Sequence, residues 1–104
     1  MEAIPVLTMT KDLPGLSEQW QVYIGYVDGA FWWGTSCSED EGFEEDERGV
    51  EWIDHGDAAF IASYLFEQVD NRKEEMLTSL EDIGFNRPEF RLLSDEFRKL
   101  TLNG

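Results

Sequence analysis

Alternation of apolar and polar residues marks the first half of the chain and predicts the strands of a β-sheet. Two runs rich in β-branched and aromatic residues, QWQVYIGYV and AFWWGTSC, lie on either side of Asp28-Gly29. This dipeptide between two such runs is typical of a type I′ hairpin with a two-residue turn. The turn fixes a register that pairs Val27 with Ala30, Ile24 with Trp33, Val22 with Thr35, and Trp20 with Cys37.

The period of two sorts these residues onto the two faces of the hairpin. The face expected to meet the core carries Trp20, Val22, Ile24, Tyr26, Phe31, Trp33, Thr35 and Cys37. On the other face Trp32 lies opposite Gly25. Tyr23 lies opposite Gly34 there, so each aromatic ring can shield the backbone of a glycine. Tyr23 and Trp32 then either support the sheet or form an exposed pair that anchors a partner.

Shorter stretches flank the hairpin and extend the predicted sheet. Residues 3–10 favour a weak edge strand, because Pro5 has no backbone N–H to donate to a ladder. Residues 11–17, which include Pro14-Gly15, predict a turn or loop. Residues 49–54 alternate and predict a third antiparallel strand after the hairpin. The connection over residues 38–48 is long for neighbouring strands, which favours a functional or mobile segment.

The second half of the chain has the spacing of helices. Residues 58–69 are apolar around most of the helix circumference, so this helix is expected to be buried and to cover the sheet. His55-Gly56 predicts a break ahead of it, and Asp57 is a natural N-cap.

The helical spacing continues past residue 69 and allows either one long helix or two. The charged Lys73 on the apolar seam and the DNRKEE cluster favour a break at Asp70-Asn71. A second helix is then expected over residues 72–83, with Gly84 at its C-cap. Pro88 suits the first turn of a last helix. That helix, to about residue 100, would bury Phe90, Leu93, Phe97 and Leu100.

Strands followed by helices indicate an α+β fold. We expect a small antiparallel sheet of three to four strands, covered on one face by two to three C-terminal helices. The 104 residues suit a single domain, with a β-rich half over residues 1–54 and a helical half over residues 57–100.

Charge is distributed unevenly along this domain. The formal net charge of -15 divides as -3 over residues 1–36, -9 over residues 38–57 and -3 over residues 58–104. The middle block holds ten acids and a single base, Arg48. Such a block costs compactness through repulsion, and it attracts cationic partners. Nucleic acids and anionic membranes would be repelled, so neither is an expected partner.

The cysteine count and the N-terminal residues bear on the compartment. A single cysteine, Cys37, excludes an internal disulfide and fits a reducing compartment or one in which redox state does not matter. The first residues lack a basic region, and no apolar run approaches the roughly 18 residues of a membrane span. A cytoplasmic protein is expected.

Few residues suit catalysis or metal binding. His55 is expected in the loop ahead of a helix cap, and Cys37 is expected on the core face of a strand, so no enzyme activity is expected. A Cys37–His55 pair would require the second and third strands to adjoin. Aligning Gly42 with the EF-hand glycine puts Arg48 where a bidentate glutamate belongs, so neither a metal site nor a cofactor is expected.

The candidate partner-binding residues combine acidic and aromatic side chains. They are Glu39, Asp40, Glu41, Glu44, Glu45, Asp46, Glu47, Glu51, Asp54, Tyr23, Trp32 and Phe43. Carboxylates held at intervals on a rigid support can imitate a phosphate backbone and compete for grooves lined by lysine and arginine. The plainer alternative is a solvated segment that only confers solubility.

In its small size, strong acidity and many aromatics the chain resembles bacterial nuclease-immunity proteins and phage-encoded inhibitors, such as anti-CRISPR or DNA-mimic proteins. The resemblance implies an acidic inhibitor of a basic nucleic-acid-handling protein, either a toxin nuclease or a defence effector. The alternative is a small interaction adaptor that uses the aromatic sheet face.

Overall fold

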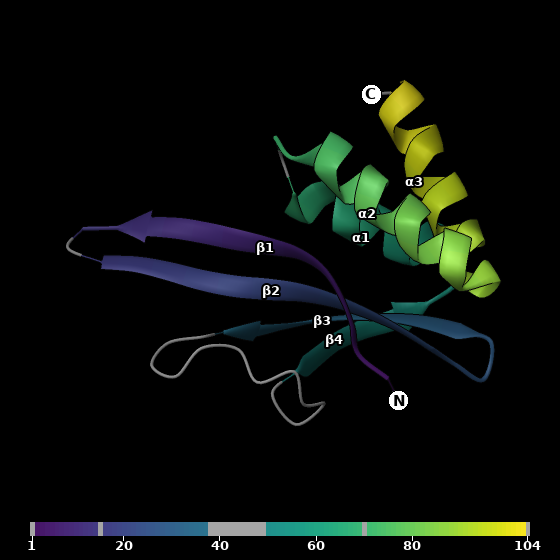
Figure 1. Cartoon of the computed structure of the whole chain (residues 1–104), viewed down its shortest axis with the longest axis horizontal. Coiled ribbons are helices and arrows are strands. Elements are labelled where there is room, and N and C mark those ends of the chain that lie inside the picture. The colour runs from purple at the N-terminus through teal and green to yellow at the C-terminus, as the bar shows by residue number, and fades with distance from the viewer. Residues whose placement is uncertain (1, 15, 38–49, 70, 104) are drawn as a thin grey trace.

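The computed structural model describes residues 2–14, 16–37, 50–69 and 71–103, and it confirms the α+β class. Four antiparallel strands form one sheet in the order β1-β2-β3-β4. The strands are β1 (Ile4–Leu13), β2 (Leu16–Val27), β3 (Ala30–Cys37) and β4 (Glu51–Gly56). They are followed by α1 (Ala58–Gln68), α2 (Lys73–Asn86), the 3₁₀ turn η2 (Pro88–Phe90) and α3 (Arg91–Asn103). The helices lie together on one face of the sheet (Figure 1).

The central hairpin has the predicted turn and register. Asp28 and Gly29 both have positive φ, 52° and 81°, as a type I′ turn requires. β2 and β3 pair Val27 with Ala30, Ile24 with Trp33, Val22 with Thr35, Trp20 with Cys37, Gly25 with Trp32, and Tyr23 with Gly34.

The first strand is longer than expected. Residues 11–17 do not form a loop, because β1 and β2 stay paired as far as Leu13 and Leu16. The connection between the two strands is therefore shorter than the predicted loop over residues 11–17. β1 lies at the edge of the sheet as predicted, and its register shifts between Pro5 and Leu7.

The last strand is displaced from its expected position. The sequence predicts a strand over residues 49–54 and a break at His55-Gly56, but β4 continues to Gly56, which pairs with Phe31. The register shifts at Ile53, so Trp33 lies opposite Asp54 while Gly34 lies opposite Trp52. A bulge of this kind breaks the period-two pattern from which the strand was read.

The helix boundaries follow the predicted break with one correction. Asp57 caps α1 by accepting a hydrogen bond from the backbone N–H of Phe60 at 2.9 Å. α1 ends at Gln68 and α2 begins at Lys73, so two helices form as expected. Gly84 is not the C-cap of α2, because the helix continues to Asn86. It is buried where α2 meets α3, and a Cβ atom there would lie 3.2 Å from Cγ of Arg91.

The core lies between the sheet and the helices. α1 packs on β3 and β4, α2 packs on β1, and α3 packs on α1 and α2. Its central members are Val22, Ile24, Phe31, Trp33, Ile61, Leu65, Met76, Leu80, Phe90, Leu93 and Phe97. Trp20 and Leu100 pack against it partly buried. Tyr26 was expected in this core, but 40% of it is exposed, since it lies at the end of β2 beside the turn.

Candidate interaction site

Most of the predicted acidic site lies outside the described residues. This applies to Glu39, Asp40, Glu41, Phe43, Glu44, Glu45, Asp46 and Glu47. The described chain fixes where that segment is attached, at Cys37 on the end of β3 and at Val50 ahead of β4.

Ion pairs within the chain engage arginines of the helical half. Arg87 holds Glu2 through hydrogen bonds of 2.5 and 2.6 Å, and Arg72 contacts Glu75 at 2.6 Å. The hydrogen bond with its arginine lowers the pKa of each glutamate below the ordinary value. These pairs are exposed, so each contributes little to stability.

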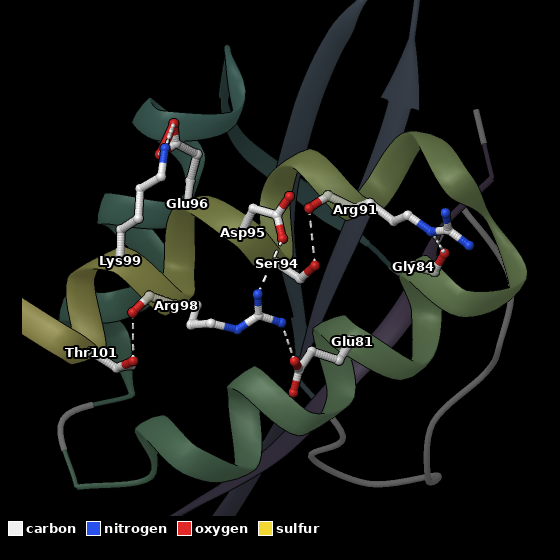
Figure 2. Close-up of polar contacts among 9 residues, drawn as sticks. All are labelled: Glu81, Gly84, Arg91, Ser94, Asp95, Glu96, Arg98, Lys99 and Thr101. Carbon is white, nitrogen blue, oxygen red and sulfur yellow. Dashed lines mark hydrogen bonds and ion pairs between the residues drawn. The ribbon is translucent and has the colours of Figure 1, made fainter.

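The other lysines and arginines of the helical half are engaged as well. The contacts are Arg98 with Glu81 and Asp95, Lys99 with Glu96, Arg91 with the carbonyl of Gly84 (Figure 2), and Lys73 over the ring of Phe66. All lysine and arginine side chains from Arg72 to Lys99 therefore contact other groups of the chain. They offer few free cations to an anionic partner.

The two acidic site residues of β4 lie on the side of the sheet that the helices cover. Glu51 pairs with Thr35 and Asp54 pairs with Trp33, and directly paired residues project to the same face. The Asp54 carboxylate accepts the backbone N–H of His55 at 2.8 Å. A side-chain hydrogen bond with Asp54, together with its negative charge, raises the pKa of Tyr64 in α1. Asp54 is therefore engaged in joining β4 to α1.

The aromatic site residues lie on the opposite face, which we call the outer face. Tyr23 is only 3% exposed and lies between Pro5 of β1 and Gly34 of β3. The exposed-pair alternative is therefore wrong for Tyr23, and the sheet-supporting alternative describes it. Trp32 is half-buried.

Two further residues join Trp32 on the outer face. The His55 ring stacks on Trp32 with centroids 4.2 Å apart and an interplanar angle of 16°. Trp52 meets Trp32 edge to face at 6.4 Å. Trp52 and His55 are not among the predicted site residues. In a regular strand they would project to opposite faces of the sheet, and only the bulge at Ile53 brings them to the same face. The sheet thus separates the aromatic cluster from Glu51 and Asp54.

The register also bears on catalysis. β3 and β4 adjoin, but His55 lies opposite Trp32, five positions from Cys37 along β3. That separation is about 17 Å, too far for a nucleophile and its base.

Among the described residues there is no group of three histidine, cysteine or acidic side chains that could hold a metal ion. None of the helices in the described ranges is both long enough and apolar enough to span a membrane.

Comparisons with protein-family models, curated proteins and solved structures found no match for this chain. Its function therefore has to be inferred from its charge and geometry.

Proposed function

We propose that this protein is a non-enzymatic acidic inhibitor of a basic nucleic-acid-handling protein, such as a toxin nuclease or a defence effector. It acts in the cytoplasm and blocks the partner's nucleic-acid site by charge mimicry. The observation that carries the proposal is the concentration of ten acids and one base within residues 38–57. A nucleic-acid groove lined by lysine and arginine is the protein surface most complementary to such a block.

The described residues support this proposal in two ways. Its helical cations are engaged in contacts within the chain, so they do little to attract an anionic ligand. The acidic segment is attached at both ends to paired strands, since Cys37 pairs with Trp20 and Glu51 pairs with Thr35. A segment held at both ends loses less conformational freedom on binding than a free tail does.

Affinity capture with two charge-matched variants tests the proposal. In the first variant Glu44, Glu45 and Glu47 become Gln and Asp46 becomes Asn. The control removes four exposed acids of the helical half through Glu67→Gln, Glu74→Gln, Asp82→Asn and Glu89→Gln. We expect the wild type and the control to retain a nucleic-acid-binding protein from a bacterial lysate at low salt, and the first variant to lose it.

If both variants lose the captured protein equally, total charge and not the acidic block determines retention. Failure of the wild type to retain any nucleic-acid-binding protein would refute the proposal.

The aromatic cluster on the outer face favours an interaction adaptor as a second candidate. The indole N–H of Trp32 is buried and makes no hydrogen bond to any described residue, and the ring stacks on His55. An adaptor should lose its partner in a Trp32→Ala and Trp52→Ala double variant that remains folded, and should keep it in the Glu44–Glu47 variant. The inhibitor should behave in the opposite way. Tyr23 does not suit this test, because its burial makes a folding defect the expected result.

A further inference from the structure

A cleft of about 440 Å³ lies between the β2–β3 turn, the start of α1 and one side of α3. The side chains that matter for its chemistry are Tyr26, Asp57, Leu92, Asp95, Glu96 and Lys99. The four α3 residues follow the spacing i, i+3, i+4, i+7, which places them along one side of the helix. The opposite side of α3 enters the core through Leu93 and Phe97.

The apolar wall of this cleft is the ring of Tyr26, which packs against two other aromatic rings. Tyr26 packs against Phe31 with centroids 4.8 Å apart and meets Phe90 edge to face at 6.2 Å. Both phenylalanines are buried, yet 40% of Tyr26 is exposed. Leu92, which also lines the cleft, is 61% exposed. The ring is therefore fixed in orientation while part of its surface remains open to a ligand.

The rim of the cleft carries more negative than positive charge. Asp57, Asp95 and Glu96 face one ammonium group, that of Lys99, which lies 3.3 Å from Glu96. Arg98 touches Asp95 at 3.4 Å but turns away toward Glu81 of α2 (Figure 2). The arrangement suits a flat cation whose stem is apolar.

We propose that this cleft receives an arginine side chain of the partner, an inference that rests on the proposed function for the partner's identity. The guanidinium group lies against Tyr26, its stem contacts Leu92, and its N–H groups donate to Asp95 and Glu96. Arginine fits better than lysine, because its guanidinium group is planar, stacks on aromatic rings and is less strongly hydrated.

The cleft forms a second contact point, remote from the attachment of the acidic segment. The turn and the Cys37 end of β3 are separated by about 23 Å along the strand. Two contact points on one folded domain raise the effective concentration of the second contact once the first has formed. The partner's surface must then present an arginine at a corresponding distance from its nucleic-acid groove.

Titration of the isotopically labelled full chain with N-acetyl-arginine methylamide, followed by NMR, tests the cleft without the partner. We expect amide shifts centred on Tyr26, Gly29 and residues 92–99. The matched control ligand is the citrulline analogue, which keeps the stem and shape but lacks the charge, and it should bind at least about twofold more weakly.

Three variants sharpen this test. Asp95→Asn should weaken binding of the arginine compound by about two- to fivefold, and Lys99→Gln should strengthen it by a similar factor, since a competing cation is removed. Asp82→Asn, an equal loss of charge at an exposed residue of α2, should leave the affinity unchanged.

Shifts spread over every acidic surface would overturn the proposal. So would equal binding of the citrulline analogue, or no gain in Lys99→Gln. If the arginine compound binds here while no nucleic-acid-binding protein is captured, only the proposed function fails. If the partner is captured but the cleft binds no arginine compound, only the cleft proposal fails.

Discussion

Replacement of Gly34 by alanine should loosen the attachment of β4 to the sheet. Gly34 lies opposite Trp52 next to the bulge at Ile53. A Cβ atom at residue 34 would lie 2.5 Å from the carbonyl oxygen of Glu51 and 3.0 Å from Cα of Trp52. These are backbone atoms, so the clash can be relieved only by moving β4 away from β3.

The magnitude follows from two opposing effects. Overpacking that forces backbone shifts costs about 1–3 kcal/mol. A Gly→Ala change also lowers the conformational entropy of the unfolded chain, which stabilises the folded state by about 0.4–1 kcal/mol. The Gly34→Ala variant should therefore lose about 1–2 kcal/mol of unfolding free energy, or roughly 4–8 °C in melting temperature for each kcal/mol.

Gly56→Ala provides a matched control. Its added Cβ would meet Cδ2 of Phe60 at 2.4 Å, a distance as short as that at Gly34. Phe60 is 43% exposed, however, and its ring can rotate into solvent. Urea denaturation followed by tryptophan fluorescence should show Gly34→Ala less stable than Gly56→Ala by at least about 1 kcal/mol. Equal stability of the two variants would refute the description of the β3–β4 contact.

Two further predictions concern a helix cap and pH. Asp57→Ala removes the side-chain oxygen that accepts the N–H of Phe60 and should lower the unfolding free energy by about 1 kcal/mol. Asp57→Asn keeps an acceptor oxygen, so urea denaturation should show most of the wild-type stability retained. Glu2 and Glu75 have lowered pKa values, so the stability they contribute is complete above the ordinary value of 4.5 and is lost as the pH falls through their folded pKa values. The seven carboxylates within residues 39–47 are expected to affect stability in the opposite direction, since close like charges favour protonation. Thermal melts at fixed ionic strength should therefore show stability rising from about pH 7 to 5 and falling at lower pH, and a steady decline from pH 7 would contradict the crowding.

Local chemistry explains which parts of the fold could be predicted from the sequence. Asp28-Gly29 specifies its turn through positive φ at both residues, and the turn then determines the whole β2–β3 register. Asp57 specifies the start of α1 in the same local manner. The role of Gly84 could not be predicted, because its small size serves a contact with Arg91 of the next helix.

The faces of the sheet were harder to predict, because a period-two pattern does not say how far the helices extend over each face. Tyr26 belongs to the core side by pattern, yet the end of the hairpin leaves it exposed. The acidic block was visible from composition alone. The engagement of Asp54 with Tyr64 was not, since it depends on the placement of α1 beside β4.

Displacement of nucleic acid from the captured partner tests charge mimicry most directly. The partner is first loaded with labelled DNA or RNA, the protein is added at increasing concentration, and the fraction of bound nucleic acid is measured by fluorescence anisotropy at several salt concentrations. Competition for one groove predicts complete displacement, with an apparent affinity that weakens as salt rises. A stable ternary complex of partner, nucleic acid and protein, with the bound nucleic acid unchanged, would contradict the proposed function.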